Sequence, residues 1–332
     1  MTYQSIGIIG AGAWGTALAQ TLAKAGRDVT VWSFEADCAE DINRDHVNRC
    51  YLDGVPLDPS VRAVSDPSSL AGRDAYLSVA PAQHTRATLE RFAPHIPDGA
   101  PVALCSKGIE ISTRSFMSDV LADVVPQAVA AVLAGPSFAA DVARGLPTAV
   151  TLACANESLG TAMVERFSSP TFRLYYSPDV LGAEVGGAVK NVLAIVCGIV
   201  LGKGLGRSAH AAIIARGFAE MRRLGTALGA DANTLTGLSG LGDLVLTCSS
   251  EMSRNMSCGL ALGRGDTLDS ILGGRNAVTE GVATAPVLKA LAEDFGVDMP
   301  ISFALADILE GRTSVDTAIA DLMSREHRPE GA

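Results

Sequence analysis

Short apolar runs alternate with helical patterns through the first half of the chain. The runs are rich in Val, Ile and Ala and are bounded by Gly, Pro or Asp; they cover 5–10, 28–33, 75–80, 101–106, 129–135 and 148–154. Amphipathic segments such as 16–26 and 85–95 lie between them. Near-continuous apolar strands separated by helices are typical of a parallel sheet that is buried on both faces. The pattern predicts an α/β Rossmann-type domain with a doubly wound parallel sheet over residues 1–177.

The pattern changes from Pro178 onward. Helical patterns dominate, as at 180–201, 208–228 and 283–295, and glycine-rich joints such as "TGLSGLGD" separate them. No convincing strand and no repeat of fixed period is visible in this half of the sequence. We therefore expect an all-α C-terminal domain over residues 178–332. A chain of 332 residues is long enough for two such domains.

The charge balance and the cysteine and histidine patterns argue against several classes of function. A formal net charge of −10 disfavours a nucleic-acid partner, because no basic stripe is available to neutralise phosphates. Seven scattered cysteines without a CxxC pair, and five histidines without an HxxxH pair, suggest neither a disulfide framework nor a metal site. The chain starts without a signal-peptide pattern, and the charge-free run 192–202 is too short to span a bilayer. We expect a cytoplasmic protein without a membrane span.

The sequence "GAGAWG" follows the first expected strand directly and leads into a helical pattern. Gly10, Gly12 and Gly15 form a G-x-G-x-x-G motif that encloses Ala13 and Trp14. The first glycine permits a tight turn, the second lets the backbone approach a pyrophosphate, and the third permits close packing of helix on strand. The N-terminus of the helix favours the negative charge of the pyrophosphate. The motif predicts a dinucleotide site.

The choice between NAD and NADP stays open at this point. NAD sites carry an acid about twenty residues beyond the motif, and NADP sites carry a basic residue nearby. After the second expected strand the chain reads "VWSFEAD", in which Glu35 could bind a ribose and Ser33 a phosphate. No arginine follows before Arg44.

A lysine interrupts the apolar stretch "VGGAVKNVLAIVCGIVLG" at 185–202. Lysine is scarce in this chain, at five residues against 21 arginines, so a lysine kept only for solubility is unexpected here. Burial lowers the pKa of an ammonium group and thereby suits it to donate a proton near neutral pH. The alternative is a snorkelling lysine, whose stem covers apolar surface while its head reaches water. The pattern favours a catalytic role for Lys190.

Three further segments carry polar residues in unusual settings. "LSGLGDLVLTC" isolates Asp243 among apolar residues, and "SSEMSRN" puts Arg254 and Asn255 in an expected polar loop. "CSKG" places Lys107 at the carboxyl end of the strand at 101–106, the edge at which open parallel sheets bind ligands. Arg254 offers a planar fork of donors that fits a phosphate, although a helix cap for Asp243 and surface positions for Arg254 and Lys107 stay open. The residues alone indicate a dehydrogenase of a small phosphorylated or carboxylated carbonyl compound.

A series of motifs along essentially the whole chain resembles bacterial NAD(P)-dependent glycerol-3-phosphate dehydrogenase. The motifs are "GAGAWGTALA", "YLDGVPL", "SKGIE", "GPSFAADVARGLPTAV", "GGAVKNVLAI", "RGFAEMRRLG", "GLGDLVLTC" and "SRN". The resemblance implies reversible reduction of dihydroxyacetone phosphate to sn-glycerol 3-phosphate by NADH or NADPH, which supplies glycerophospholipid synthesis. The expected partner is therefore a small phosphorylated substrate, and we expect a homodimer formed through the helical domain.

The same resemblance implies roles for matching residues. Lys190, Lys107 and Asp243 would be catalytic, with Lys190 as the proton donor and acceptor and Thr247 beside it. The substrate would be bound by Lys107, Gly135, Ser137, Lys190, Asp243, Ser253, Arg254 and Asn255, and the cofactor by Gly10, Gly12, Ala13, Trp14, Gly15, Phe34, Lys107, Ala139, Arg254 and Glu280. Phe34 stands where members often carry Arg or His, so a firm preference for NADP is not implied. Ser208 and Ala215 also replace residues that are usual in the family.

Two other functions stay open on the sequence. A β-hydroxyacid dehydrogenase would share the glycine loop, the helical second domain and the catalytic lysine, but it would need a carboxylate-binding segment where this chain has "GPSF". A non-catalytic dinucleotide sensor would not need Lys107, Lys190 and the Arg254–Asn255 pair together.

Overall fold

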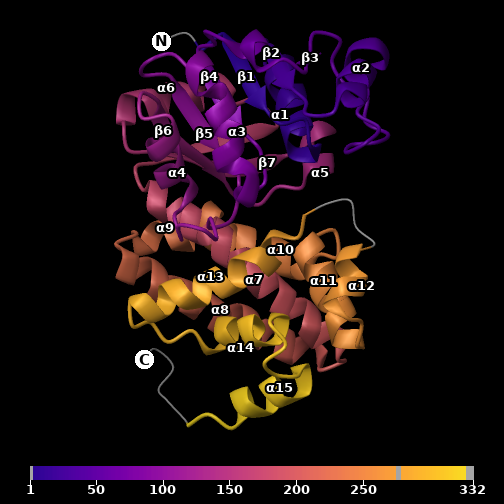
Figure 1. Cartoon of the computed structure of the whole chain (residues 1–332), viewed down its shortest axis with the longest axis vertical. Helices are drawn as coiled ribbons and strands as arrows, with labels where there is room; N and C mark the ends of the chain where they lie inside the picture. The colour runs from indigo at the N-terminus through magenta and orange to yellow at the C-terminus, as the bar shows by residue number, and fades with distance from the viewer. Residues whose placement is uncertain (1–2, 274–277, 327–332) are drawn as a thin grey trace.

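The computed structural model describes residues 3–273 and 278–326, which form two lobes stacked along the long axis of the molecule (Figure 1). The upper lobe in that view holds a β-sheet and its helices. The described part of the lower lobe is helical. The last strand ends at Ser177 and the first long helix begins at Val180, so the proposed division between residues 177 and 178 falls in the link between them.

An eight-stranded sheet with the order β3-β2-β1-β4-β5-β6-β7-β8 forms the centre of the first lobe. The strands are β1 (Ser5–Ile9), β2 (Asp28–Trp32), β3 (Arg62–Val64), β4 (Ala75–Ser78), β5 (Pro101–Leu104), β6 (Val129–Ala134), β7 (Thr148–Cys154) and β8 (Phe172–Ser177). The first six are parallel to one another, with Ile6 paired to Val29 of β2 and to Ala75 of β4. The strand order reverses at β1, and such a switch point is where dinucleotides bind in open α/β sheets.

Helices cover both faces of this sheet. One face carries α1 (Ala13–Lys24), α2 (Ala36–Asp45), α5 (Ala139–Ala143) and α6 (Glu157–Phe167), and the other carries α3 (Thr85–Phe92) and α4 (Met117–Val124). Short 3₁₀ turns lie at Pro67–Leu70, Ala82–His84 and Ala93–His95. The predicted doubly wound Rossmann-type fold is therefore confirmed, and it follows from strands whose residues are buried on both sides.

The last two strands differ from the prediction of a wholly parallel sheet. β7 runs antiparallel to β6, and β8 is parallel to β7. The connection from β6 to β7 contains only the five-residue helix α5, which spans roughly 7–8 Å. A parallel crossover usually carries the chain back along the sheet on a longer helix, whereas here the chain returns after this short helix and the next strand runs the opposite way.

β3 and β8 were missing from the sequence prediction. β3 has three residues, too few for a periodic signal. β8 is an edge strand in which buried Phe172 and Leu174 alternate with exposed Arg173 and Tyr175. That alternation is the signal that could have identified it.

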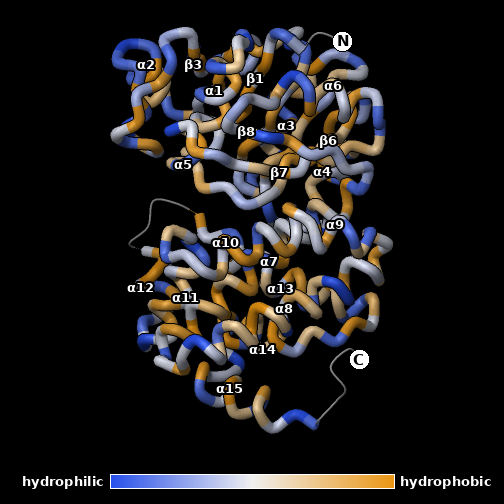
Figure 2. The backbone as a smooth tube through the Cα atoms, turned by 180° about the vertical axis from the view of Figure 1, so that it is seen from behind, coloured by the Kyte–Doolittle hydropathy of each residue, from blue (hydrophilic) through white to orange (hydrophobic). Residues whose placement is uncertain are grey.

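The second lobe is built around α7 (Val180–Gly202), which packs against helices on several sides. The other helices are α8 (Gly206–Leu228), α9 (Ala232–Thr236), a π-helical turn η4 (Leu238–Gly242), α10 (Asp243–Ser249), α11 (Arg254–Arg264), α12 (Leu268–Gly273), α13 (Glu280–Asp294), α14 (Pro300–Leu309) and α15 (Val315–Met323). Figure 2 shows apolar segments gathered around α7 inside this lobe. The predicted all-α C-terminal region is confirmed over the described residues.

α7 closely matches the helical segment predicted at 180–201. The sequence interpretation tested only the charge-free run 192–202 for its ability to span a bilayer, whereas the whole helix, with Lys190 inside it, has 23 residues and a mean hydropathy of 1.9 over its most apolar window. By length and composition alone such a helix could cross a membrane. However, 83% of the window is buried inside the protein, so the neighbouring helices already cover its apolar surface.

Glycines let α7 and α11 approach each other at backbone distance. A Cβ added at Gly259 would lie 1.9 Å from the carbonyl oxygen of Ile195, and one at Gly198 would lie 2.1 Å from that of Met256. Gly202 and Gly263 make the same kind of contact one turn further on. The position of α11 beside α7 therefore depends on these residues having no side chain.

We expect Gly259→Ala to destabilise the protein by about 1–3 kcal/mol, because overpacking forces two helices apart. The measurement is thermal unfolding followed by far-UV circular dichroism. Gly273→Ala is the matched control, since a Cβ at that exposed helix end meets no atom within 4 Å. Equal unfolding temperatures for the two variants would contradict the close approach of α7 and α11.

Candidate active site

The glycine loop lies between the carboxyl end of β1 and the start of α1. Gly10 has φ +118°, a conformation that side chains rarely adopt, and a Cβ at Gly15 would lie 1.9 Å from the Gly10 carbonyl oxygen. A Cβ at Gly12 meets no atom within 4 Å, so the space beside this residue is open. Gly12 is also the N-cap of α1, which begins with Ala13 and Trp14. Gly10 thus permits the turn, Gly12 leaves room for a ligand, and Gly15 allows the helix to contact the turn, as a dinucleotide site requires.

The segment after β2 carries the predicted adenosine side of that site. Phe34 is 69% exposed. Ser33 is fully buried and its hydroxyl donates to the Glu35 carbonyl oxygen at 2.8 Å, so the suggestion that Ser33 binds a phosphate is wrong. The Glu35 carboxylate accepts a hydrogen bond of 2.9 Å from the Tyr51 hydroxyl, and this bond raises the pKa of Tyr51 to about 12. Glu35 is held at the N-terminus of α2.

Lys107 lies beyond the carboxyl end of β5, beside the end of β6. Its Nζ donates to the Gly135 carbonyl oxygen at 3.3 Å, and the Ser137 hydroxyl donates to the same oxygen at 3.1 Å. Gly135 has φ +151°, and a Cβ there would lie 2.8 Å from the Val150 Cα. Ala139 follows as the first residue of α5. The structure thus brings Lys107, Gly135 and Ser137 together at the sheet edge.

Asp243 joins the two lysines. Its Oδ2 lies 2.7 Å from the Nζ of Lys107, and its Oδ1 lies 2.8 Å from the Nζ of Lys190. The Lys190 ammonium also donates to the Thr247 hydroxyl at 2.8 Å, and that hydroxyl donates to Asp243 at 3.2 Å. The Asp243 side chain is 1% exposed and that of Lys190 is 7% exposed, whereas Lys107 is 16% exposed. A snorkelling position for Lys190 is excluded, because its head ends in this buried cluster.

The burial and the charges shift two pKa values in this cluster. Burial, opposed by Asp243 and aided by the nearby Lys107 ammonium, lowers the pKa of Lys190 to about 8. Burial by itself would raise the pKa of Asp243, but the two ammonium groups and their hydrogen bonds outweigh it and hold that pKa below its usual value. At neutral pH the cluster therefore keeps one carboxylate between two cations.

A chain of amide groups connects Lys107 to the helical lobe. The Asn191 side chain donates to the Lys107 carbonyl oxygen at 2.9 Å and accepts from the Asn255 side chain at 2.9 Å. The Asn255 oxygen in turn accepts from the Gly281 N–H at 3.0 Å. Asn191 was given no role from the sequence, although it adjoins Lys190. The amide of Asn255 is therefore engaged within the protein through both of its polar atoms.

The sequence interpretation placed Arg254 and Asn255 in a loop. In the structure they are the first two residues of α11. Ser253 is the N-cap of this helix, and its hydroxyl accepts from the Met256 N–H at 3.2 Å. A serine just before an apolar helical segment is a typical N-cap, and this was the signal in the sequence that the interpretation missed. Arg254 is exposed, and Asn255 is buried. The first turn of α11 thus holds an exposed arginine next to the buried amide.

Glu280 begins α13 and links it to the first lobe. One of its carboxylate oxygens accepts from the Ala82 N–H, just after β4, at 3.1 Å. His210 is buried, with its Nε2 2.7 Å from the Cys248 carbonyl oxygen.

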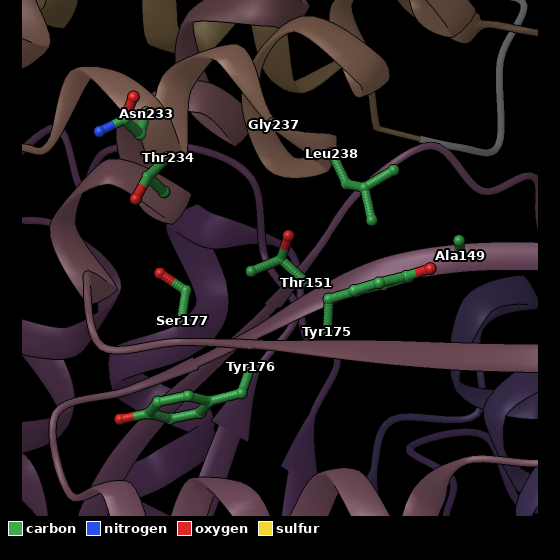
Figure 3. A pocket seen from close by; sticks show the side chains of 9 residues that line it. All are labelled: Ala149, Thr151, Tyr175, Tyr176, Ser177, Asn233, Thr234, Gly237 and Leu238. Carbon is green, nitrogen blue, oxygen red and sulfur yellow. The ribbon is translucent and has the colours of Figure 1, made fainter.

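A pocket of about 450 Å³ lies near this region at the edge of the sheet (Figure 3). It is lined by Ala149, Thr151, Tyr175, Tyr176, Ser177, Asn233, Thr234, Gly237 and Leu238. None of these is a predicted site residue. Its walls are formed by β7, β8, α9 and the start of η4, and no residue of the charged cluster around Asp243 lines it.

The arrangement suits reduction of a small anionic carbonyl compound. The cluster carries a net positive charge, which attracts an anion locally in a protein whose overall charge repels it. Lys190 has a pKa close enough to neutrality to donate and regain a proton.

Comparison with known proteins identifies the family. Residues 5–160 match the profile of the NAD-dependent glycerol-3-phosphate dehydrogenase N-terminus, and residues 179–320 match that of the C-terminus. Together the two profiles cover most of the chain.

Individual relatives agree with this match. The chain is 62% identical over 323 residues to glycerol-3-phosphate dehydrogenase [NAD(P)+] of Maricaulis maris, with 97% of each chain covered. It is 58% identical over 330 residues to that of Caulobacter vibrioides, covering 99% of this chain and 100% of the relative. The crystal structure of glycerol-3-phosphate dehydrogenase from Coxiella burnetii superposes with a TM-score of 0.92 at 38% identity, covering 97% of this chain and 99% of the other. The chain belongs to the NAD-dependent glycerol-3-phosphate dehydrogenase family.

Proposed function

We propose that this protein catalyses the reversible reduction of dihydroxyacetone phosphate to sn-glycerol 3-phosphate with NADH or NADPH, which supplies glycerophospholipid synthesis. The observation that carries the proposal is the buried Lys190–Asp243–Lys107 cluster. It lies at the same edge of the sheet as the glycine loop, where the carboxyl ends of β1 and β5 are found. Membership of the family and the names of its relatives supply the identity of the substrate.

Lys190 is the proposed proton donor. The reduced nicotinamide supplies a hydride to the carbonyl carbon of the substrate when it is bound. As the C=O double bond becomes a single bond, its oxygen takes a proton from the Lys190 ammonium, which leaves a neutral amine that regains a proton before the next turnover. In the reverse direction the neutral amine accepts the proton of the alcohol. Asp243 holds the Lys190 Nζ in place at 2.8 Å and stays ionised throughout.

Lys107 and Arg254 are the proposed anchors of the substrate. The second ammonium of the cluster, at Lys107, faces the same carboxylate and is the more exposed of the two lysines, so it can contact both the substrate and the nicotinamide end of the cofactor. Arg254 presents a guanidinium fork at the start of α11, a group that binds phosphate through two hydrogen bonds. We assign Asn255 and Asn191 to positioning these groups, because their amides are bonded to each other.

The cofactor residues are proposed on the same basis. The open space at Gly12 and the N-terminus of α1 would take the pyrophosphate, and Ala13, Trp14 and Gly15 form that first turn. Phe34 would border the adenosine, and Ala139 and Glu280 would lie toward the nicotinamide side. Gly135, Ser137 and Ser253 would line the substrate.

A β-hydroxyacid dehydrogenase is the nearest alternative, since it would use the same lysine and the same glycine loop. It would need a carboxylate-binding segment where this chain has "GPSF", and it would have no need for the "SRN" segment that carries Arg254. A dinucleotide sensor without catalysis would leave the two lysines and the buried carboxylate without a function. We further propose that the enzyme works in the cytoplasm, without a membrane span, as a homodimer through the helical lobe.

Lys190→Arg should keep the fold and the dinucleotide affinity but lower kcat by about 10²–10⁴, the usual contribution of general acid–base catalysis. Guanidinium stays protonated at any working pH and cannot cycle its proton. Steady-state turnover with dihydroxyacetone phosphate, beside a cofactor titration on the same preparation, measures both. Lys203→Arg at the end of the same helix, where the lysine pairs with Asp316, is the control. Near-normal turnover of the Lys190 variant would assign the proton to another group.

Arg254→Ala should raise the KM for dihydroxyacetone phosphate about 10–100-fold, because a hydrogen bond to a charged group is worth about 1.5–3 kcal/mol. Initial rates at varied substrate and saturating NADH give this constant. Arg264→Ala removes the same charge from the other end of α11 and should leave the KM unchanged. If the two variants behave alike, Arg254 does not contact the phosphate.

Both NADH and NADPH should support turnover, with kcat/KM values within about a hundredfold of each other, some 2.7 kcal/mol. The reason is that Phe34 provides neither a charge for the 2′-phosphate nor a carboxylate for the ribose. Oxidation of each cofactor, followed at 340 nm against a panel of small ketones and keto acids, tests the ratio and the substrate in one experiment. A preference for a keto acid without a phosphate would favour the β-hydroxyacid dehydrogenase.

A further inference from the structure

An arginine from a distant part of the sequence lies at the end of β2. Arg91 is in the last turn of α3, and its guanidinium carbon lies 5.6 Å from the centre of the Phe34 ring. Both side chains are exposed. The sequence has no arginine between the end of β2 and Arg44. Arg91 lies beside this segment because the fold brings α3 close to the end of β2.

Packing beneath the two side chains fixes their positions. The Trp32 ring contacts that of Phe92, next to Arg91, with centroids 5.2 Å apart, and that of Phe34 at 6.2 Å. Trp32 and Phe92 are buried, and the Trp32 indole donates to the Ser65 carbonyl oxygen at 2.9 Å. The last turn of α3 is therefore attached to the end of β2 through an aromatic cluster, and Arg91 stays beside Phe34.

Arg91 differs from the neighbouring arginine in its partners. Arg44, the first arginine after β2 in the sequence, pairs with Asp41 at 3.1 Å and with Asp45 at 3.0 Å. No ion pair connects Arg91 to a carboxylate within residues 3–273 and 278–326; its charge rests on the face of Phe34. A guanidinium stacked in this way keeps the donors at its edge for a further ligand.

The location is the one at which dinucleotide folds distinguish their cofactors. β2 lies directly beside β1, which carries the glycine loop, and the residues after β2 recognise the adenosine ribose at its 2′ position. The Glu35 carboxylate on the same segment disfavours an anion at that position. The arginine supplies the positive charge that the segment itself lacks.

We propose that Arg91 is a specificity-determining residue that recognises the 2′-phosphate of NADPH from α3, with Phe34 as its platform. The inference rests on the proposed function for its cofactor but concerns only the adenosine end. It explains how a chain with phenylalanine after β2 can still accept NADPH.

The test compares Arg91→Ala and Arg91→Lys with the unaltered protein, and uses Arg222→Ala, an exposed arginine of α8, as the control for net charge. Isothermal titration with adenosine 2′,5′-bisphosphate and with adenosine 5′-monophosphate isolates the 2′-phosphate from the nicotinamide. We expect Arg91→Ala to weaken the bisphosphate about tenfold and the monophosphate less than twofold, since one charge-assisted contact is lost. The affinity of Arg91→Lys for the bisphosphate should lie between those of Arg91→Ala and the unaltered protein. Across these variants the kcat/KM for NADPH should fall in parallel with the affinity for the bisphosphate, whereas the kcat/KM for NADH should not.

Equal weakening of both nucleotides, or no change in either, would overturn the proposal, because Arg91 would then only support Phe34 or lie outside the site. These outcomes are distinct from failure of the proposed function. That failure would appear as unaltered protein that oxidises neither cofactor with dihydroxyacetone phosphate.

Discussion

One buried carboxylate between two ammonium groups governs the rest of the site. An isolated ammonium inside an apolar helix lobe would be too costly to keep charged. Asp243 accepts from Lys190 and Lys107 through separate oxygens, which offsets that cost for both cations at once. Since the cluster has one anion for two cations, a positive charge remains for a phosphorylated substrate, and Lys190 keeps a pKa near neutrality.

The same contact couples the two lobes. Lys107 belongs to the loop after β5 of the sheet lobe, and Asp243 begins α10 of the helical lobe. Asn191 and Glu280 add hydrogen bonds across the same junction, to the Lys107 carbonyl and to the Ala82 N–H. A site formed in this way exists only when both lobes are folded and in contact. The geometry of the cluster therefore depends on the assembly of both lobes.

Much of this arrangement could be predicted from the sequence. The glycine motif specifies a strand, a turn and a helix through local geometry, and the isolated charges of Lys190 and Asp243 stand out because their neighbours are apolar. The prediction that strands deliver ligand groups to their carboxyl ends correctly placed Lys107 at the edge of the sheet. These features depend on neighbours in the chain or on a general rule of the fold.

The rest depends on contacts between distant segments. The direction of β7 is defined by its antiparallel pairing with β6, and the burial of Ser33 follows from the packing of the residues around it. The internal bonds of Asn255 require α7 and α13 to be in place. Arg91 meets Phe34 only because Trp32 and Phe92 pack together. No spacing in the sequence carries that information.

In the proposed mechanism the proton affinity of Lys190 depends on Asp243, and a pH profile tests this dependence most directly. Reduction requires the ammonium form, so kcat/KM for dihydroxyacetone phosphate should fall as the pH rises through about 8. Asp243→Asn removes the charge that raises this pKa and leaves burial and Lys107, which lower it. The pH at which kcat/KM falls should therefore be lower in Asp243→Asn by about one unit or more, and this variant should retain its dinucleotide binding. A break that stays in place or moves to higher pH would contradict the account.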